Sequence, residues 1–173
     1  MREPVHGNFD LLHLSAIHHQ LFREVYPWAG EIRTEEIAKG ETVFTTRAII
    51  VPLSAQLFST LHRANDLRDM NARDFVENAA NLYLSINAIH PFPEGNGRAQ
   101  REFIRTLGLN AGYALDWSRV DKETLLDATI ASTYKPGDPA LQSQLDRTLV
   151  NRQPSRSIQR AYDELEFDRE YER

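Results

Sequence analysis

The residues of this sequence that could act together in chemistry are concentrated in residues 90–101, which combine an imidazole, a carboxylate, two glycines and two guanidinium groups. The apolar spacing around them predicts a helix that ends at Ile89, a tight loop and a second helix. The N-terminus of a helix presents unbonded N–H groups and a partial positive charge, which together hold anions. Gly95 and Gly97 would let a phosphate approach, because glycine has no Cβ and tolerates positive φ. The stretch therefore predicts a phosphate-binding loop.

Each polar side chain of the stretch has a predicted task. His90 could serve as a general base, because imidazole titrates near neutral pH. Glu94 offers hard oxygen ligands beside the loop, which suits Mg²⁺. Arg98 and Arg101 are i and i+3 on the second helix, so they share a face and could bind further phosphates. Asn96 is placed to cap that helix, and its amide could also face a ligand.

Two less specific interpretations of the stretch stay open from the residues alone. The first is an ordinary solvated turn over residues 94–97, with His90 merely closing a helix. The second is a basic turn that binds sulfate or nucleic acid. The formal net charge of −5 argues against sequence-independent binding to DNA and against binding to an anionic membrane surface.

The whole stretch resembles the Fic family signature, His-Pro-Phe-x-Asp/Glu-Gly-Asn-Gly-Arg-x-x-Arg, and matches it at every specified position. Fic proteins typically transfer AMP from ATP to a Ser, Thr or Tyr hydroxyl of a target protein and release pyrophosphate. The resemblance implies that His90 deprotonates the hydroxyl and that Glu94 holds Mg²⁺ on the α- and β-phosphates of ATP. The further residues that it implies are the anion-hole amides of Gly95, Asn96 and Gly97, the β-phosphate ligand Arg98, the γ-phosphate ligand Arg101 and the buried anchor Phe92.

The resemblance leaves the reaction itself open. Some relatives transfer phosphate or phosphocholine, or remove AMP, and a member without turnover would be a nucleotide-binding interaction module. The intact His90 and Glu94 favour AMP transfer over these alternatives.

Composition sets the expected class of protein. The chain has 173 residues, of which 41% are hydrophobic, enough for one domain with a real core. There is no cysteine, which excludes disulfides and thiolate metal sites and fits a reducing compartment. No segment approaches the roughly 20 apolar residues of a membrane span, and the N-terminus has no apolar signal core. We expect a cytoplasmic bacterial enzyme, with delivery into another cell left open.

Hydrophobic spacing predicts an all-α, mainly helical bundle with one small β-hairpin, which is also the fold that the resemblance implies. Helices are expected over residues 9–26, from Pro52 with an apolar stripe, over 75–89, from the signature to Ala111, from Asp121 and from Asp138. The stripe consists of Leu53, Leu57, Leu61 and Leu67. We expect a single domain over residues 1–173, with its core over about 9–150 and a charged C-terminal helix or tail over 155–173. His13, His18 and His19 of the first helix are expected at its surface or edge.

A β-hairpin is predicted within residues 31–45, because a turn at residues 39–41 precedes a stretch rich in β-formers. The alternative is an irregular loop packed by Ile32, Ile37 and Phe44. The resemblance implies a flap that pairs with an extended target segment and holds its hydroxyl near His90. The flap residues are Lys39, Gly40, Glu41, Thr42, Val43 and Phe44.

Fic enzymes are often restrained by a helix with the pattern Ser/Thr-x-x-x-Glu-Gly/Asn, whose glutamate pairs with the second signature arginine. Here Glu precedes Gly or Asn only at Glu94 and Glu77, and neither has Ser or Thr four residues earlier. Three possibilities remain: a separate small antitoxin protein restrains the enzyme, a longer native chain carries the inhibitory helix, or the enzyme is not restrained. We favour the separate antitoxin. Toxin-like relatives modify type II topoisomerases, so the expected target is a DNA gyrase or topoisomerase IV subunit.

Overall fold

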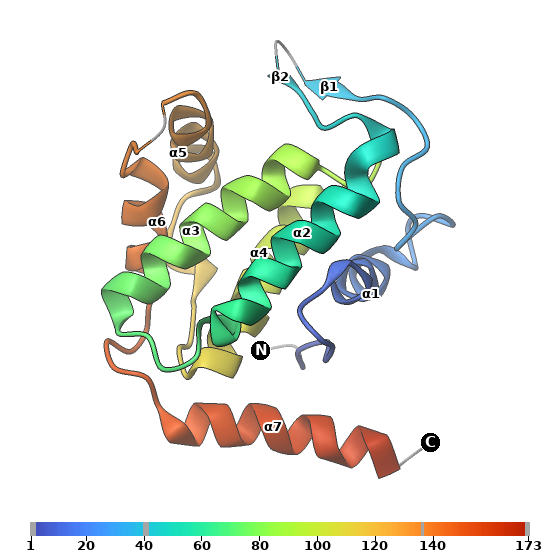
Figure 1. Cartoon of the computed structure of the whole chain (residues 1–173). Helices are drawn as coiled ribbons and strands as arrows, with labels where there is room; N and C mark the ends of the chain where they lie inside the picture. Colours follow the sequence, from blue (N-terminus) through green and yellow to red (C-terminus); the bar gives the residue numbers. More distant parts are fainter. Residues whose placement is uncertain (1–2, 40–41, 136, 172–173) are drawn as a thin grey trace. The chain divides into compact units, whose positions relative to one another are not determined.

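The structure is a computed structural model that describes residues 3–39, 42–135 and 137–171, and it is mainly helical as expected (Figure 1). The α-helices of this part of the chain are α1 (Leu11–Phe22), α2 (Ile50–Arg63), α3 (Ala72–Ile89), α4 (Asn96–Ala111), α5 (Lys122–Tyr134), α6 (Ala140–Thr148) and α7 (Arg156–Tyr171). Short 3-10 helices occur at η1 (Arg47–Ile49), η2 (Asn65–Leu67) and η3 (Trp117–Arg119). Strands β1 (Ala38–Lys39) and β2 (Thr42–Val43) pair antiparallel, with Ala38 opposite Val43.

The chain divides into two compact units. The first unit contains Met1–Asn65 and Ser85–Thr106, and the second contains Asp66–Leu84 and Leu107–Arg173. Helices α3 and α4 each contribute to both units, whereas the signature and the hairpin belong wholly to the first. The single domain over residues 1–173 stays a prediction.

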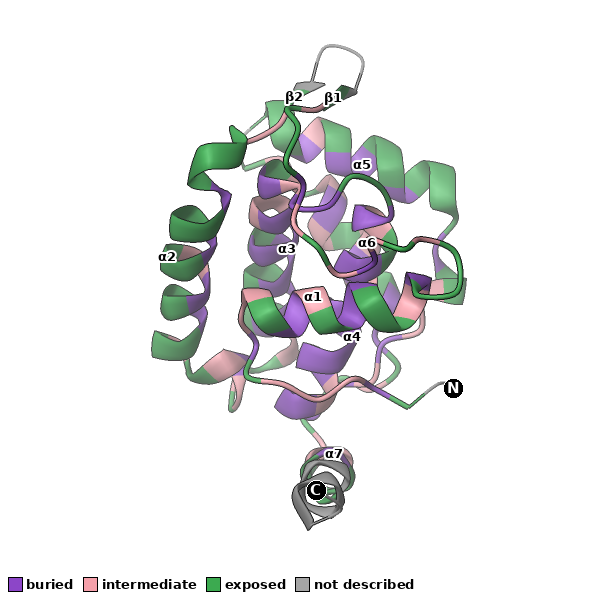
Figure 2. Cartoon of the chain, turned by 90° about the vertical axis from the view of Figure 1, so that its right-hand side faces the viewer, coloured by how far each residue is buried: buried purple, intermediate pink, exposed green. Residues whose placement is uncertain are grey.

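The first unit is built around Phe103 of α4, which is fully buried. Phe9 meets its ring edge-on with 5.9 Å between centroids, and Phe58 of α2 lies at 5.5 Å. Figure 2 shows the buried stripe along one side of α2 and the exposed residues along the other. The buried positions of α2 are Ile50, Ser54, Phe58 and Leu61.

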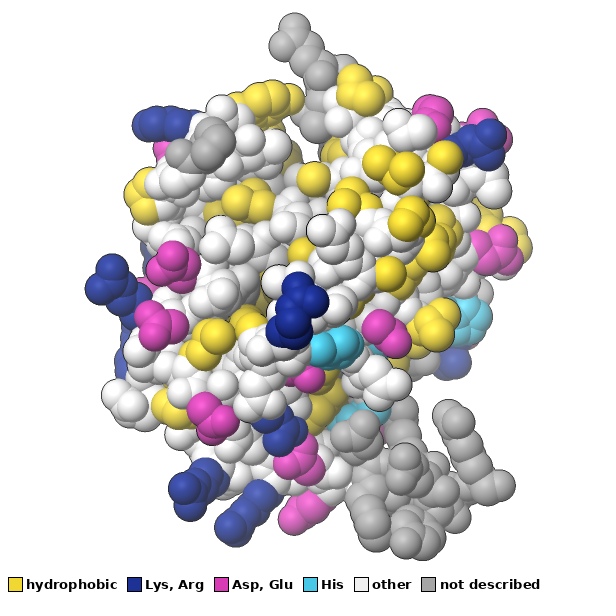
Figure 3. All heavy atoms as spheres, in the orientation of Figure 1, with side chains coloured by type: hydrophobic (Ala, Val, Ile, Leu, Met, Phe, Trp, Pro, Cys, Tyr) yellow, Lys and Arg dark blue, Asp and Glu magenta, His cyan; other side chains and the backbone are white. Residues whose placement is uncertain are grey.

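Two details predicted for α2 are wrong. The helix begins two residues before Pro52, and the stripe is rotated so that Leu53 is 37% exposed and Leu57 is half-buried. Ile49, Val51 and Leu53 are large apolar residues exposed at or just before the start of this helix, and Figure 3 shows hydrophobic side chains on this face of the molecule. The large Phe58 ring takes the core position, where it lies beside the ring of Phe103 and is 2% exposed.

The histidines of α1 correct a second expectation. Asp10 caps this helix by accepting a hydrogen bond from the His13 N–H at 2.7 Å. His19 is exposed as expected, but His13 and His18 are buried at 2% and 0% exposure. The ring of His13 accepts from the Phe9 N–H at Nδ1 and donates from Nε2 to the Val5 carbonyl at 2.7 Å. Both ring nitrogens are therefore satisfied by backbone, which lets a polar ring lie in the core.

The second unit is held together around the end of α4. Gly112 ends the helix with φ +85°, and a Cβ there would lie 2.8 Å from the Ser155 nitrogen. The Gly112 carbonyl accepts hydrogen bonds from the Ser155 N–H and the Asn151 amide at 2.8 and 2.9 Å. Tyr113 stacks on Phe75 with 4.6 Å between ring centroids. These contacts fix the segment that leads into α7.

The charged C-terminal segment forms a helix, one of the two alternatives left open by the sequence. Tyr162 of α7 is buried, and Asp163 accepts a hydrogen bond from Arg68 at 2.7 Å. Within the described residues, no helix has the length and apolar character that crossing a membrane requires.

Candidate active site

The signature forms the link between α3 and α4, and its own residues end one helix and begin the next. The His90 N–H still bonds the Ile86 carbonyl at 2.9 Å, but the φ of His90 is +48°, which turns the chain out of the helix. Pro91 then prevents the helix from continuing. At Gly95 the φ is +83°, and its carbonyl accepts from the N–H groups of Arg98 and Ala99, both at 3.1 Å. The helix cap is therefore the residue Gly95.

Asn96 does not cap α4, and that expectation was wrong. Its side-chain oxygen accepts from the Phe92 N–H at 3.0 Å, and its amide donates to the Phe92 carbonyl at 2.7 Å. Asn96 is 3% exposed, and both ends of its side-chain amide face the loop backbone. The side chain closes residues 92–96 into a rigid loop.

The two glycines of the signature have different surroundings. A Cβ on Gly95 would lie 2.6 Å from the Phe22 ring, so both space and φ require glycine there. Gly97 does not have positive φ, contrary to expectation, and the nearest atom to a Cβ on Gly97 would be Arg101 Nη1 at 3.7 Å. In the part of the chain that the structure describes, no neighbour is close enough to require glycine at position 97, whereas a ligand that approaches the backbone would require it.

The backbone N–H groups of Asn96 and Gly97 begin α4. Among the described residues, no hydrogen-bond acceptor pairs with either of them. The Gly95 N–H is bonded at 2.9 Å to the carboxylate of Glu94. Two donors at the positive end of a helix form an arrangement that binds an anion.

His90 is oriented by a neighbour on each side. Its Nδ1 lies 3.1 Å from the Asn87 carbonyl, which can only accept, so Nδ1 carries the proton and Nε2 the lone pair. The ring stacks on Phe44 with 3.8 Å between centroids and 24° between planes. The imidazole is thus held in the tautomer that a base acting through Nε2 requires.

The remaining polar residues of the signature lie at the surface of the first unit. Arg98 is exposed, and its guanidinium lies 4.2 Å from the centroid of the Phe22 ring. Arg101 is half-buried one turn further along α4. The Glu94 carboxylate is exposed beside the loop N–H groups. Mg²⁺ in nucleotide sites is commonly held by one or two carboxylates and by substrate phosphates, and Glu94 fits that donor set.

Two residues under the loop were missed from the sequence, namely His18 and Phe22. The His18 ring stacks on Phe92 at 4.0 Å and donates from Nε2 to the Glu94 carbonyl at 2.9 Å. Its Nδ1 accepts from the Gly30 N–H at 2.9 Å. Burial lowers the pKa of His18, which favours this neutral form. The available signal was the helical spacing of Leu14, His18 and Phe22, which is four residues at each step.

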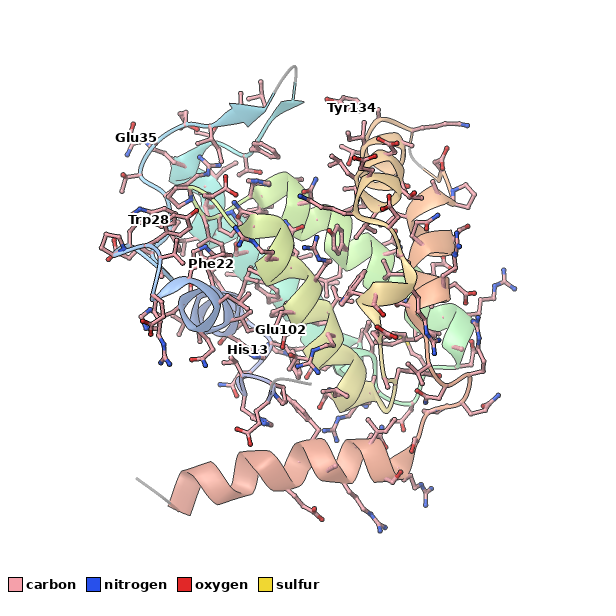
Figure 4. The ribbon with its side chains drawn as sticks, turned by 180° about the vertical axis from the view of Figure 1, so that it is seen from behind. His13, Phe22, Trp28, Glu35, Glu102 and Tyr134 are labelled. Carbon is pink, nitrogen blue, oxygen red and sulfur yellow. The ribbon has the colours of Figure 1, made fainter. Side chains whose placement is uncertain are left out.

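Figure 4 places Phe22 at the end of α1 and Trp28 on the segment that follows. Phe92 itself is 1% exposed, which fits the anchor that the signature implies. The same view shows His13 of α1 close to Glu102 of α4, the residue that directly follows the signature.

The hairpin is attached beside His90. The Thr45 N–H and hydroxyl both donate to the Ala88 carbonyl of α3, each at 3.0 Å. Val43 is 82% exposed, and Phe44 covers the His90 ring. Gly40 and Glu41 lie outside the described residues, as do the side chains of Lys39 and Thr42. The role of residues 39–44 as a flap stays a prediction.

In a comparison with protein families, residues 8–107 match the family described as Fic/DOC. The protein adenylyltransferase VbhT of Bartonella schoenbuchensis is 36% identical over 176 residues, which cover 98% of this chain and 37% of that protein. A probable protein adenylyltransferase Fic of Salmonella typhimurium is 41% identical over 114 residues, which cover 66% of this chain and 57% of that one. The chain thus spans between about a third and somewhat over half of these curated relatives.

Solved structures give matching folds. BepC of Bartonella tribocorum, a VirB-translocated effector with bound AMPPNP, superposes with a TM-score of 0.76 and 29% identity, covering 86% of this chain and 78% of that one. The N-terminal Fic domain of a VirB-translocated effector of Bartonella quintana, with bound ADP, has a TM-score of 0.78 and 27% identity, covering 90% and 78%.

Proposed function

This chain belongs to the Fic/DOC family, and from that premise we propose that it is a protein adenylyltransferase. It would transfer AMP from ATP to a Ser, Thr or Tyr hydroxyl of a target protein and release pyrophosphate. The observation that carries the proposal is the orientation of His90, whose Nδ1–H bonds the Asn87 carbonyl. The loop that follows begins a helix whose first two N–H groups have no acceptor among the described residues. A base and an anion site are therefore one short loop apart.

The proposed reaction follows from these positions. Nε2 of His90 takes the proton of the target hydroxyl as its oxygen attacks the α-phosphorus of ATP. The bond from that phosphorus to the bridging oxygen of the β-phosphate breaks, and pyrophosphate leaves with the electron pair. The N–H groups of Asn96 and Gly97 and the guanidinium of Arg98 stabilise the charge that develops on the phosphate oxygens. Arg101 holds the γ-phosphate.

Glu94 would hold Mg²⁺ on the α- and β-phosphates, where the ion would neutralise charge on the leaving group. The fit rests on the exposed carboxylate of Glu94. It accepts a hydrogen bond from the Gly95 N–H, so its oxygens face the N-terminus of α4. The relatives BepC, with AMPPNP, and the Bartonella quintana effector, with ADP, support a nucleotide as the ligand.

The experiment that tests the proposal is incubation of the chain with Mg²⁺ and α-labelled ATP in a cell lysate. The His90→Ala variant is expected to lose about 10²–10⁴-fold of the labelling rate and to keep ATP binding, because it lacks only the base. His62→Ala removes an exposed histidine of α2 and is the matched control, which should label like the unchanged chain. Labelling that persists in His90→Ala would contradict the proposed role.

Other labels and lysates separate the alternatives. Transfer from γ-labelled ATP would mean phosphate transfer, and ATP binding without pyrophosphate release would mean an interaction module. A band in bacterial lysate at the mass of a DNA gyrase or topoisomerase IV subunit would support the expected target. A band found solely in lysate of another cell type would instead support delivery of the kind that the VirB-translocated relatives undergo.

We also propose that a separate small protein restrains this enzyme through a glutamate that pairs with Arg101. Support comes from the sequence given, in which neither Glu77 nor Glu94 has the pattern of an inhibitory helix. Co-purification of a small protein that is released by Arg101→Ala would support this restraint. Full activity that no co-expressed neighbouring gene product alters would contradict it.

A further inference from the structure

Arg33 is a buried cation in the segment between α1 and the hairpin. Its side chain is 1% exposed. Its Nε donates to the His90 carbonyl at 2.8 Å, and Nη1 donates to the Glu35 carbonyl at 2.7 Å. Nη2 donates to the Thr45 carbonyl and, at 3.4 Å, to the Ile89 carbonyl. The guanidinium thus bonds two separate parts of the chain.

The first part is the turn that carries the base. The Arg33 backbone N–H donates to the Pro91 carbonyl at 2.9 Å, so the consecutive carbonyls of residues 89, 90 and 91 all accept from Arg33. His90 has φ +48°, a conformation that residues with a Cβ rarely adopt. Such a conformation persists where the surrounding contacts over-determine it. Arg33 supplies those contacts.

The second part is the stem of the hairpin. Glu35 precedes β1 and Thr45 follows β2, so the carbonyls bonded by Arg33 lie on both sides of the hairpin. Figure 4 shows Glu35 on the segment that rises from Trp28 toward the hairpin. Phe44, the residue before Thr45, stacks on the His90 ring. The position of this ring stack therefore depends on the two ends that Arg33 connects.

The charge of Arg33 fits this place. The carbonyls at the C-terminus of α3 carry the negative end of the helix dipole, which favours a cation. The carboxylate of Glu36, whose side chain is 57% exposed, lies 3.6 Å from Nη1. Glu36 also accepts from the Arg47 N–H at 3.1 Å. A planar fork of five N–H donors can reach four carbonyls at once, which a lysine ammonium cannot.

We propose that Arg33 is a positioning residue that fixes His90 and the hairpin as one unit. Arg33 then adds bonds from one side chain to both the turn of the base and the segment that would present the target hydroxyl, beside the bonds from Thr45 to the Ala88 carbonyl. The catalytic consequence rests on the proposed AMP transfer, whereas the structural coupling does not. ATP would bind on the loop of residues 94–101, which His18 and Asn96 hold independently of Arg33.

The test compares Arg33→Lys with Arg63→Lys, measured well below the unfolding temperature of each variant. Arg63 is an exposed arginine that bonds Ser59 and Thr60 of its own helix, so its variant is the matched control. Arg33→Lys should lower kcat for AMP transfer by about 10–100-fold, because small misplacements of a base are that costly. Its KM for ATP should stay within about twofold of the unchanged chain, since the phosphate loop is not altered.

A second readout does not need the reaction. Long-range ¹H–¹⁵N spectra of the imidazoles, with His90 assigned by comparison with His90→Ala, report which ring nitrogen carries the proton. The unchanged chain should show Nδ1–H at His90, and Arg33→Lys should show a mixture of tautomers. If Arg33→Lys does not fold, Arg33→Gln replaces it, because a neutral amide is less costly to bury.

Three outcomes are informative. Unchanged kcat together with an unchanged His90 tautomer in the folded Arg33 variant would overturn the proposal. Equal losses in kcat and ATP affinity, with an unchanged His90 tautomer, would also overturn it, because they would indicate a general structural role. No transfer by the unchanged chain would instead refute the proposed function, and the tautomer at His90 would still decide the role of Arg33.

Discussion

Residues 89–97 link α3 to α4, and the two halves of this link are held in opposite ways. Residues 89–91 turn their carbonyls inward onto the buried cation Arg33. Residues 92–97 rest on neutral groups, namely the rings of His18 and Phe22 and the amide of Asn96, and their N–H groups begin a helix. The first half fixes the side chain of His90, which would accept a proton. The second half presents backbone N–H groups that would bind a ligand. The comparison suggests that base placement and nucleotide binding can be altered separately.

The largest effect within the second half is expected from Gly95→Ala. The new Cβ would lie 2.6 Å from the Phe22 ring at φ +83°, so the loop must shift and stability should fall by about 1–3 kcal/mol or more. Thermal unfolding and ATP binding measure this loss. Gly97→Ala is the matched control, because its Cβ would meet no atom closer than 3.7 Å.

Gly97→Ala should keep the unfolding temperature and weaken ATP binding, if a phosphate approaches that backbone. Equal destabilisation by the two alanine variants would remove the distinction between a glycine required by the fold and one required by the ligand.

A smaller loss is expected from Asn96→Ala. The variant leaves the N–H and carbonyl of Phe92 without the partners that now lie at 3.0 and 2.7 Å, at about 1–3 kcal/mol for a buried group left unsatisfied. Chemical denaturation measures the change. Asn96→Asp keeps the acceptor and loses the donor, so its stability should be intermediate. If Asn96→Ala is as stable as the unchanged chain, the amide does not hold the loop.

The last effect concerns acidity and needs no substitution in the loop. Burial lowers the pKa of both His13 and His18 below the ordinary value of 6.5. Below that pH the unfolded chain binds more protons than the folded one, so stability should fall as the pH falls from about 6.5. The slope is at most about 1.4 kcal/mol per pH unit for each histidine. By about pH 8 these two groups should contribute almost no pH dependence, because a histidine of the ordinary pKa is then nearly all neutral in the unfolded chain.

Denaturation between pH 5 and 8 (about 1.5 units either side of the ordinary value) measures this slope, with His19→Gln as the control. His18→Gln should reduce the slope in acid, whereas His19→Gln, which removes an exposed histidine, should leave it unchanged. A slope that survives removal of both buried histidines would have another origin.

Much of this arrangement could be predicted from the sequence, because it depends on local patterns. The spacing of Phe75, Ala79, Leu82, Ile86 and Ile89 located α3, and all five are buried. Gly112 ends α4 as expected, and the order of residues in the signature placed a loop before α4.

What could not be predicted depends on distant parts of the chain. His18 is buried, and its two ring nitrogens are hydrogen-bonded to the backbone of Gly30 and Glu94, which are 12 and 76 residues away in the sequence. Asn96 is a residue type suited to caps, but positive φ at Gly95 starts the helix one residue earlier and leaves the amide to bond Phe92. Periodicity predicted a buried stripe on α2, whereas its rotation depends on which ring fits beside Phe103.

The stack of Phe44 on His90 gives this molecule a natural reporter. An imidazole 3.8 Å below an aromatic ring lies in the shielding zone of that ring, so its carbon-bound protons should resonate upfield of those of an exposed histidine. Any target segment that moves the hairpin would move Phe44 and release this shielding. The resonance of one histidine would then signal the arrival of a target before a phosphate bond has changed.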